Sequence, residues 1–299
     1  MAEKTANVTI NGENLDDMKK RSTLVDVWRR FRKRKVAMVG LIIVLALVLI
    51  AVFADVIAPY DFAQQDLIHK LNFPSKEHWL GTDNFGRDIL TRMIYGGRTS
   101  LLVSLFGCVI SFGIGGIIGA VSGFYSGKVD VLLMRLMDVL MAIPGTLFAV
   151  IISAALGTGW WQTSIAVAIG GIAPAARLMR ATVLSLRQME YIEAAKAYGS
   201  KDWRTIYRHI IPNCLAPVLV DITLRLGGCI MMISGLSFIG LGVQPPQAEW
   251  GAMLNAGRPY VTTFYPLILF PGIAILLAML GFNLFGDGLR DALDPKQKQ

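Results

Sequence analysis

Two ionisable residues lie inside a long apolar stretch in the second half of the chain. Asp221 and Arg225 are four residues apart, so a helix would place them on one face. Arg225 lies about ten residues into this stretch, roughly 15 Å deep at about 1.5 Å per residue. A charge at that depth costs at least about 2.5–3.5 kcal/mol to insert, which marks a candidate functional site. Arg225 could bind the carboxylate of a passing solute; alternatively, the two charges simply neutralise each other.

Pro144 is the third candidate for a solute pathway. Like Pro174, it lies in apolar sequence that we expect to be helical. Proline removes a backbone donor and kinks a helix, which a moving pathway could use, although such kinks are also ordinary in membrane helices. Arg135 and Asp138 are three residues apart at one end of an apolar run, and Asp55 ends another. We expect the first two to pair with each other.

A polar segment, residues 191–213, interrupts the apolar stretches. It carries Glu193, Ala194 and Ala195, followed by Gly199. Alanines present little bulk, so a partner surface can approach closely. Gly199 suits a left-handed helix C-cap. We therefore predict two short helices joined by a sharp turn.

The second of these helices follows Gly199 directly. Ser200 can cap it, Asp202 complements its N-terminal dipole, and Pro212 prepares the return into the bilayer. Its apolar residues recur at helical spacing: Trp203, Ile206 or Tyr207, and Ile210. Outside a bilayer, such a stripe requires a groove on another protein.

Composition places the whole chain in a membrane. Its 299 residues are 54% hydrophobic and 17% charged, whereas a typical soluble domain has about 25% charged residues. Uncharged runs of about 20 residues predict spans, and we predict an all-α integral membrane protein with six. Of the 29 Lys and Arg residues, 22 fall in the segments that six spans would place inside. The positive-inside rule then puts both termini in the cytoplasm.

The charged segments also divide the chain into parts. Leu24, Trp28 and Phe31 predict an amphipathic helix lying on the inner headgroups, with a solvated arm as the alternative. Ile89, Leu90, Met93 and Ile94 predict a short interfacial helix in the outer loop. The predicted parts are a cytoplasmic arm at 1–35, a first span at 36–58, an outer loop at 59–98, a five-span core at 99–287 and a cytoplasmic tail at 288–299.

Within the core, glycines and prolines mark helix packing and turns. Gly115, Gly119 and Gly123 repeat every four residues, which predicts close helix packing rather than a nucleotide-binding loop. The predicted core segments are a second span at Thr99–Gly127, a short inner turn with Lys128, Asp130 and Arg135, a hairpin of two spans at Val139–Ala176, a fifth span at Ala216–Leu241 and a sixth at Thr262–Leu284.

Several functional classes lack their residues in this chain. The three cysteines have no C-x-x-C spacing, and Asp83, Asn84 and Asp88 lack the spacing of an EF-hand. No nucleotide-binding G-x-x-x-x-G-K-[ST] motif is present. The basic residues cluster beside a span, which argues against nucleic-acid binding. We therefore predict no catalytic residue, metal or bound cofactor, and a membrane enzyme is disfavoured.

Five segments in order resemble the second permease subunit of dipeptide and oligopeptide ABC importers, over about Trp28 to Pro295. They are the EAA segment with its glycine, HWLGTDNFGRD with YGGRTS, QPP with EWGAML, the closing FNLFGDGLRDALDPK, and the order of six spans. The resemblance implies a type I ABC-importer permease fold with cytoplasmic coupling helices. His209 stands where the family ideal is apolar, and peptide-type permeases commonly have His there. We read it as a loop-stabilising or interface residue.

The same resemblance implies partners and a location. These are a second homologous permease, two ATPase subunits that carry ATP and Mg²⁺, an extracytoplasmic substrate-binding protein, and the bacterial cytoplasmic membrane. The residues that would meet the ATPase are Glu193, Ala194, Ala195, Tyr198, Gly199, Asp202, Trp203, Ile206, Tyr207, His209 and Pro212.

Other solutes and another class of transporter remain open. A glutathione, nickel-chelate or oligosaccharide importer would share these features, because the binding protein can select the solute. A stand-alone channel or secondary transporter predicts inverted repeats and a midplane ion site, and it leaves segment 191–213 without a purpose.

Overall fold

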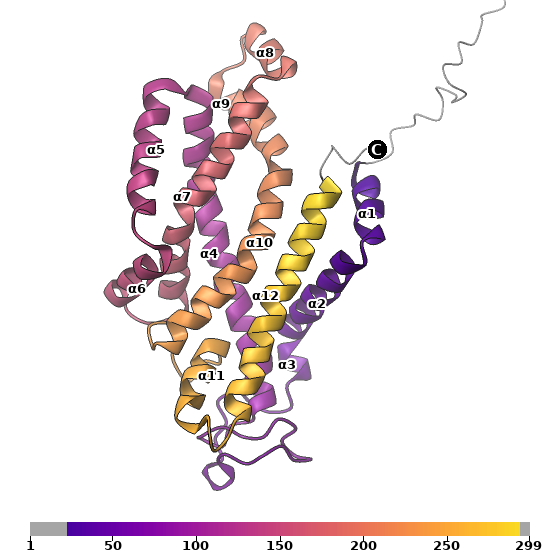
Figure 1. Ribbon diagram of the computed structural model, residues 1–299, viewed down its shortest axis with the longest axis vertical. Helices are drawn as coiled ribbons and strands as arrows, with labels where there is room; N and C mark the ends of the chain where they lie inside the picture. The colour runs from indigo at the N-terminus through magenta and orange to yellow at the C-terminus, as the bar shows by residue number, and fades with distance from the viewer. Residues whose placement is uncertain (1–22, 294–299) are drawn as a thin grey trace, which may run out of the picture.

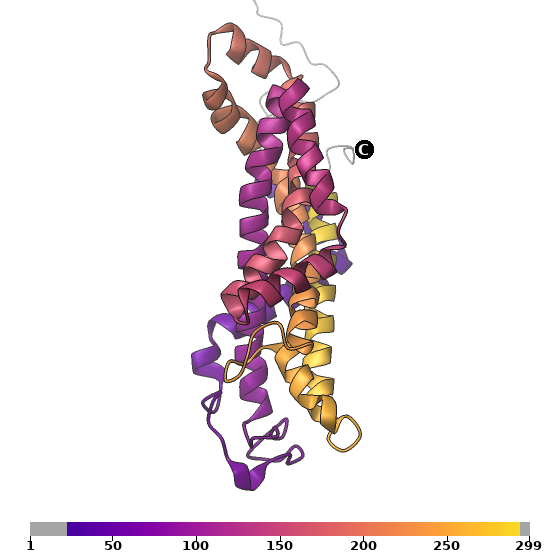
Figure 2. The ribbon, with the colours of Figure 1, turned by 90° about the vertical axis from the view of Figure 1, so that its left-hand side faces the viewer.

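The structure is a computed structural model that describes residues 23–293, and it is built of helices. The long helices run side by side, with α8 at one end of the molecule and α11 beside an irregular segment at the other (Figures 1 and 2). Within residues 23–293 no strand forms, and the β-structure is one bridge between Thr82 and Asp88. The arm before residue 23 and the tail after residue 293 lie outside the described residues. The helices are α1 Thr23–Lys33, α2 Lys35–Val52, α3 Ala54–Ile57, α4 Ile89–Tyr125, α5 Gly127–Met141, α6 Gly145–Leu156, α7 Trp160–Arg187, α8 Glu190–Ala197, α9 Asp202–Thr205, α10 Ile211–Phe238, α11 Trp250–Gly257 and α12 Pro266–Leu293, with short turns of helix at Leu67–His69, Ile206–Ile210 and Arg258–Tyr260.

Five helical runs among the described residues are long and apolar enough to cross a bilayer. They are α2, α4, α7, α12 and the run Asp202–Phe238 that contains α10. A sixth crossing requires α5 and α6 together, and these are bent by 82°. The bend lies at Pro144, because a residue before proline avoids the helical conformation and Pro144 itself becomes the N-cap of α6. Pro174, in contrast, lies inside α7 without ending it.

The predicted boundaries of the second and third spans are wrong. Helix α4 begins at Ile89 rather than Thr99, so the expected interfacial helix is its first part. Asp88 fixes this start, since its side chain accepts a hydrogen bond from the Thr91 N–H at 2.7 Å. Helix α5 covers the residues assigned to an inner turn. These helices extend into polar sequence because tertiary contacts satisfy their charged residues.

Helices α4 and α7 pack through the predicted glycine stripe. A Cβ at Gly115 would lie 2.5 Å from the Ile172 carbonyl oxygen, and one at Gly119 would lie 2.2 Å from the Ala176 carbonyl oxygen. Gly123 would meet the same helix, 2.9 Å from the Val183 Cβ. The close approach of the two backbones therefore requires glycine at these positions.

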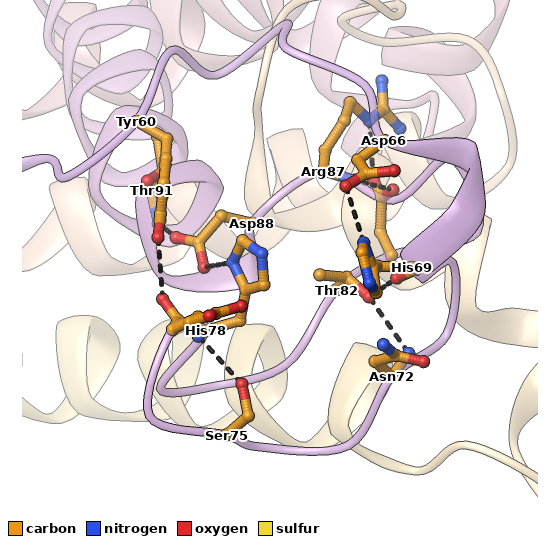
Figure 3. Close-up of polar contacts among 12 residues, drawn as sticks. Tyr60, Asp66, His69, Asn72, Ser75, His78, Thr82, Arg87, Asp88 and Thr91 are labelled. Atoms are coloured by element: carbon orange, nitrogen blue, oxygen red, sulfur yellow. Dashed lines mark hydrogen bonds and ion pairs between the residues drawn. The ribbon is translucent and has the colours of Figure 1, made fainter.

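The segment between α3 and α4 is held by polar side chains (Figure 3). The buried Asp83 carboxylate accepts hydrogen bonds from the Arg87 N–H at 3.0 Å and the Arg87 Nε at 2.6 Å. Asp88 bonds His78 at 2.9 Å in addition to capping α4. Asp66 and His69 lie 2.7 Å apart, and this hydrogen bond lowers the pKa of Asp66 and raises that of His69. The aspartates thus serve as turn and cap residues.

Three consecutive residues fix α11 to the bundle. Glu249 is fully buried, and its carboxyl group accepts two N–H groups of the first turn of α11, at 2.8 and 2.9 Å, and the Ser100 hydroxyl at 3.0 Å. Burial raises the pKa of Glu249. The Trp250 indole donates to a carbonyl of α4 at 3.0 Å. A Cβ at Gly251 would lie 2.2 Å from the Ser234 carbonyl oxygen of α10.

Candidate coupling site and solute pathway

Helix α8 ends in the left-handed turn that the sequence predicts at Gly199. This residue has φ +75°, and the Tyr198 and Ser200 N–H groups bond the carbonyls of Ala194 and Ala195 at 3.0 and 3.1 Å. This pair of bonds satisfies the last carbonyls of the helix. The expected cap by Ser200 is wrong: α9 has no side-chain cap, and the Ser200 hydroxyl accepts a bond from Thr205.

The predicted apolar stripe of the second helix divides between two surroundings. Ile210 is fully buried and Ile206 is half-buried, both in the chain's own core with Ile192. Trp203 and Tyr207 are instead 66% and 71% exposed. The expectation that a partner covers the whole stripe is therefore wrong, because the isoleucines anchor the hairpin to its own bundle.

Three exposed aromatic side chains gather on this hairpin. Tyr198 is 93% exposed and joins Trp203 and Tyr207 on the outside. A hollow of about 650 Å³ is lined by Tyr198 and Trp203, together with Arg204 and His209. We name this region the coupling surface. Its further members on α8, Glu193 and Ala194, are exposed, while Ala195 is half-buried. Such a concentration of exposed aromatic area is typical of a protein interface.

The coupling surface is joined to a span without a break. Helix α9 passes through one π-helical segment, Ile206–Ile210, into α10, and the Ile211 N–H still bonds the Ile206 carbonyl. Pro212 is the second residue of α10 and directly follows the π-helical segment and Ile211. The whole run Asp202–Phe238 forms one long helical element. Trp203 is therefore connected to α10 by continuous helix rather than by a separate loop.

The predicted pathway residues fall in two places. Asp221 and Arg225 form an ion pair within α10, and the Arg225 guanidinium lies over the Phe112 ring at 5.8 Å from its centroid. The two charges thus neutralise each other, as the alternative reading expects. Pro144 lines a separate hollow of about 200 Å³ between α5, α6 and α7. The lining of that hollow includes no residue of α10.

The structure contains two further ion pairs, of which one contradicts a prediction and the other was not predicted. Asp138 pairs with Arg177 of α7 at 2.5 Å, so the expected pairing with Arg135 is wrong. Asp55 pairs with Arg98 of α4 at 2.9 Å. Each pair joins two helices that are distant in sequence, so helical spacing alone could not reveal it.

The C-terminal parts of α4 and α7 and the start of α5 are joined by a network that the sequence did not predict. Asp130 bonds both Nε and Nη2 of Arg180, at 2.5 and 2.6 Å, and accepts the Ser122 hydroxyl at 2.5 Å. Arg187, near the start of α8, donates to Ser126 at 2.6 Å. The available signal was an acidic residue, Asp130, between the basic residues Lys128 and Arg135. Its partner is 50 residues away in sequence.

Comparison with known proteins decides the family. Residues 115–299 match the family described as "Binding-protein-dependent transport system inner membrane component". Residues 22–74 match the "N-terminal TM domain of oligopeptide transport permease C". The chain belongs to this permease family.

Individual relatives of the permease cover nearly its full length. It is 45% identical over 280 residues to the dipeptide transport system permease protein DppC of Alkalihalophilus pseudofirmus, covering 92% of each chain. It is 43% identical over 274 residues to the glutathione transport system permease protein GsiD of Pectobacterium atrosepticum, covering 91% of each. These relatives are transport permeases rather than enzymes. The permease is accordingly a membrane subunit of an ABC transporter.

A solved structure supports the fold of the permease. An inward-facing structure of the MetNI methionine ABC transporter matches with a TM-score of 0.54 at 15% identity, over 68% of this chain and 97% of that chain. The all-α, multi-span type I ABC-importer permease fold is thereby confirmed.

Proposed function

We propose that this permease forms half of the translocation pathway of an ATP-driven importer for short peptides. The 45% identity to a dipeptide permease over 92% of both chains supports this substrate class. In this proposal a homologous permease completes the pathway, two ATPase subunits bind the coupling surface, and an extracytoplasmic binding protein delivers the peptide. ATP and Mg²⁺ are held by the ATPases, and this chain holds no cofactor. The complex lies in the bacterial cytoplasmic membrane.

The proposed orientation places the coupling surface in the cytoplasm together with both termini. Helix α8, the start of α1 and the end of α12 lie toward the same end of the molecule (Figure 1). The segments assigned to this end carry 22 of the 29 Lys and Arg residues, which agrees with the positive-inside rule. The outer segments around α11 carry few.

The single observation that carries the proposed coupling is the exposure of Trp203 and Tyr207 on a helical run continuous with a span, with Tyr198 exposed in the turn that precedes this run. Closing of the ATPases on ATP would move these aromatic residues, and α10 would tilt with them. Ile210 and Ile206 keep the hairpin attached to the bundle during this motion. ATP hydrolysis on the partner subunits would then return the aromatic residues and α10 to their starting positions.

The test removes the three aromatic rings and leaves the backbone intact. We expect the variant Tyr198→Ala/Trp203→Ala/Tyr207→Ala to bind the ATPases at least about 30-fold more weakly, since one buried aromatic anchor is worth about 2 kcal/mol or more. The control is Trp79→Ala, which removes an outer side chain that is 71% exposed. The measurements are co-purification of the ATPases and uptake of a radiolabelled dipeptide. Retention of the ATPases by the triple variant would refute the coupling assignment.

For the solute pathway we propose that Arg225 contacts the peptide carboxylate. Its Nε is paired with Asp221, and within the described residues its two terminal nitrogens have no hydrogen-bond partner. A guanidinium fork binds a carboxylate through two such donors. We expect Arg225→Gln to reduce uptake of a free-acid dipeptide and leave uptake of its C-terminal amide unchanged. An equal loss for both peptides would instead indicate a structural role.

A second candidate solute is glutathione, because a glutathione permease is 43% identical over 91% of this chain. Competition separates the two proposals. Glutathione would be favoured as the solute if an excess of it, unlabelled, abolishes dipeptide uptake by the assembled importer. Dipeptide uptake that glutathione leaves unaffected would support the peptide assignment.

A further inference from the structure

A concentration of cations lies where α1 meets α2. Six of the seven residues 29–35 are basic. Arg34 pairs with Asp291 of α12. Within residues 23–293, no ion pair forms at the other five. We name these five the basic corner: Arg29, Arg30, Arg32, Lys33 and Lys35. Among the described residues, no acidic side chain neutralises their charge.

The basic corner is held rigidly against the end of α12. Phe31 is only 3% exposed and packs on the Phe285 ring, with ring centroids 5.6 Å apart. A Cβ at Gly288 would lie 2.2 Å from the Ala37 Cβ and 3.0 Å from the Phe31 ring. The corner can approach α12 only because that residue is glycine. The cations beside Phe31 are thus carried by a packed element.

A hollow of about 400 Å³ opens on the other side of α1. Its lining combines apolar and cationic side chains: Val25, Trp28, Arg29, Arg32 and Lys33. Trp28 is stacked on Phe31 at 6.0 Å, and half of its surface is exposed. An aromatic wall beside three cations suits a ligand that is anionic at one point and apolar at another.

The position of the hollow relative to the bilayer indicates which ligand this is. The uncharged run of α2 begins at Val36, directly after Lys35, and Val36 and Val39 are 61% and 50% exposed. The cations therefore lie at the level of the headgroups, and an exposed apolar face for acyl chains starts beside them. An acidic protein segment would pair with the cations but would leave that apolar face uncovered.

We propose that the basic corner binds the phosphate of an anionic phospholipid of the inner leaflet. Arg29, Arg32 and Lys33 meet the phosphate, while Trp28 packs on the glycerol region. The acyl chains run along the exposed face of α2. Each cation near an anionic headgroup contributes about fivefold to lipid affinity. The lipid would hold the α1–α12 corner in place while α10 moves.

The experiment compares the assembled importer with two charge-matched variants. The test variant is Arg29→Gln/Arg32→Gln, and the control is Lys70→Gln/Lys76→Gln, which removes two exposed cations from the outer segment. Native mass spectrometry counts the lipids retained from nanodiscs of phosphatidylglycerol or of phosphatidylcholine with the same chains. We expect the test variant to bind phosphatidylglycerol about 30-fold more weakly, with no change in the control.

Three results would overturn the proposal. They are equal phosphatidylglycerol retention by the test and control variants, equal retention of phosphatidylcholine and phosphatidylglycerol by the wild type, and loss of ATPase subunits rather than lipid from the test variant. A further arm adds inorganic phosphate at millimolar concentration. The lipid should stay bound, because phosphate lacks the apolar contact; its release would identify a site for free phosphate instead.

Discussion

Replacing Gly119 by alanine should separate α4 from α7. A Cβ at this position would lie 2.2 Å from the Ala176 carbonyl oxygen, 2.8 Å from the Met179 Cβ and 2.9 Å from the Arg180 nitrogen. All three atoms belong to the backbone or to a Cβ, so no side-chain rotation relieves the contact. The helices must move apart by about 1 Å to restore an ordinary separation of 3.4 Å.

The size of the effect follows from two opposing terms. Inserting a methyl group into a tightly packed interface costs about 1–3 kcal/mol or more, because a gap of about 1 Å forfeits up to roughly half of the local dispersion energy. Alanine gains back up to about 1 kcal/mol of helix propensity. Gly113 on the same helix is the matched control, since nothing lies within 4 Å of a Cβ there. The propensity gain is common to both variants, so Gly119→Ala should be less stable than Gly113→Ala by the steric cost, about 1–3 kcal/mol.

Buried thiols provide the assay. Cys108 is 2% exposed and Cys214 is fully buried, so once the half-buried Cys229 is replaced by serine in both variants, a fluorescent maleimide should label this subunit only as it unfolds. The temperature of labelling, read on the separated subunit of the purified complex, should be lower for Gly119→Ala than for Gly113→Ala. Dipeptide uptake should fall in parallel. If the two variants label at the same temperature, the close approach of α4 and α7 does not limit stability.

Three further predictions concern the turn, the outer cap and the buried acid. Gly199→Ala places a side chain at φ +75° with open space around it, which costs a local strain of about 1–2 kcal/mol. This strain should lower the number of peptides transported per ATP hydrolysed without disrupting assembly. The control Gly228→Ala should leave that ratio unchanged. Asp88→Ala should lower the thermal midpoint by the equivalent of about 1 kcal/mol or more through loss of the α4 cap, and Asp88→Asn should retain most of it. Burial raises the pKa of Glu249, so the folded state binds its proton more tightly than the unfolded state, and stability should fall as the pH rises above about 4.5. In Glu249→Gln the thermal midpoint should depend less on pH between pH 5 and pH 8. An unchanged pH dependence of the midpoint would contradict the raised pKa.

The local sequence was sufficient to predict structure where the backbone conformation requires one residue type. Gly199 adopts the left-handed turn because only glycine does so without strain. Proline was less decisive: the chain bends at Pro144, whereas Pro174 lies inside α7 without ending it. The spacing of Gly115, Gly119 and Gly123 likewise indicated a close helix contact before its partner was known. The absence of charge over about 20 residues predicted most of the spans.

Pairings between distant residues could not be obtained this way. Asp130 meets Arg180, Asp138 meets Arg177 and Glu249 meets Ser100 only because the bundle brings separate helices together. The sequence assigned Asp138 to Arg135, since helical spacing reports neighbours on the same helix and nothing else.

The sequence by itself determined that the chain crosses a membrane, that it turns sharply at Gly199, and that its segments match an importer permease. Only the tertiary structure decided which face of the coupling hairpin is available to a partner. Trp203 and Ile210 are both apolar and share one helical stripe, yet one is 66% exposed and the other is fully buried. The difference arises from packing against Ile192 of α8, a contact that depends on the shape of the folded hairpin. Periodicity shows that a helix has an apolar face, whereas the surrounding helices determine how much of that face the chain itself covers.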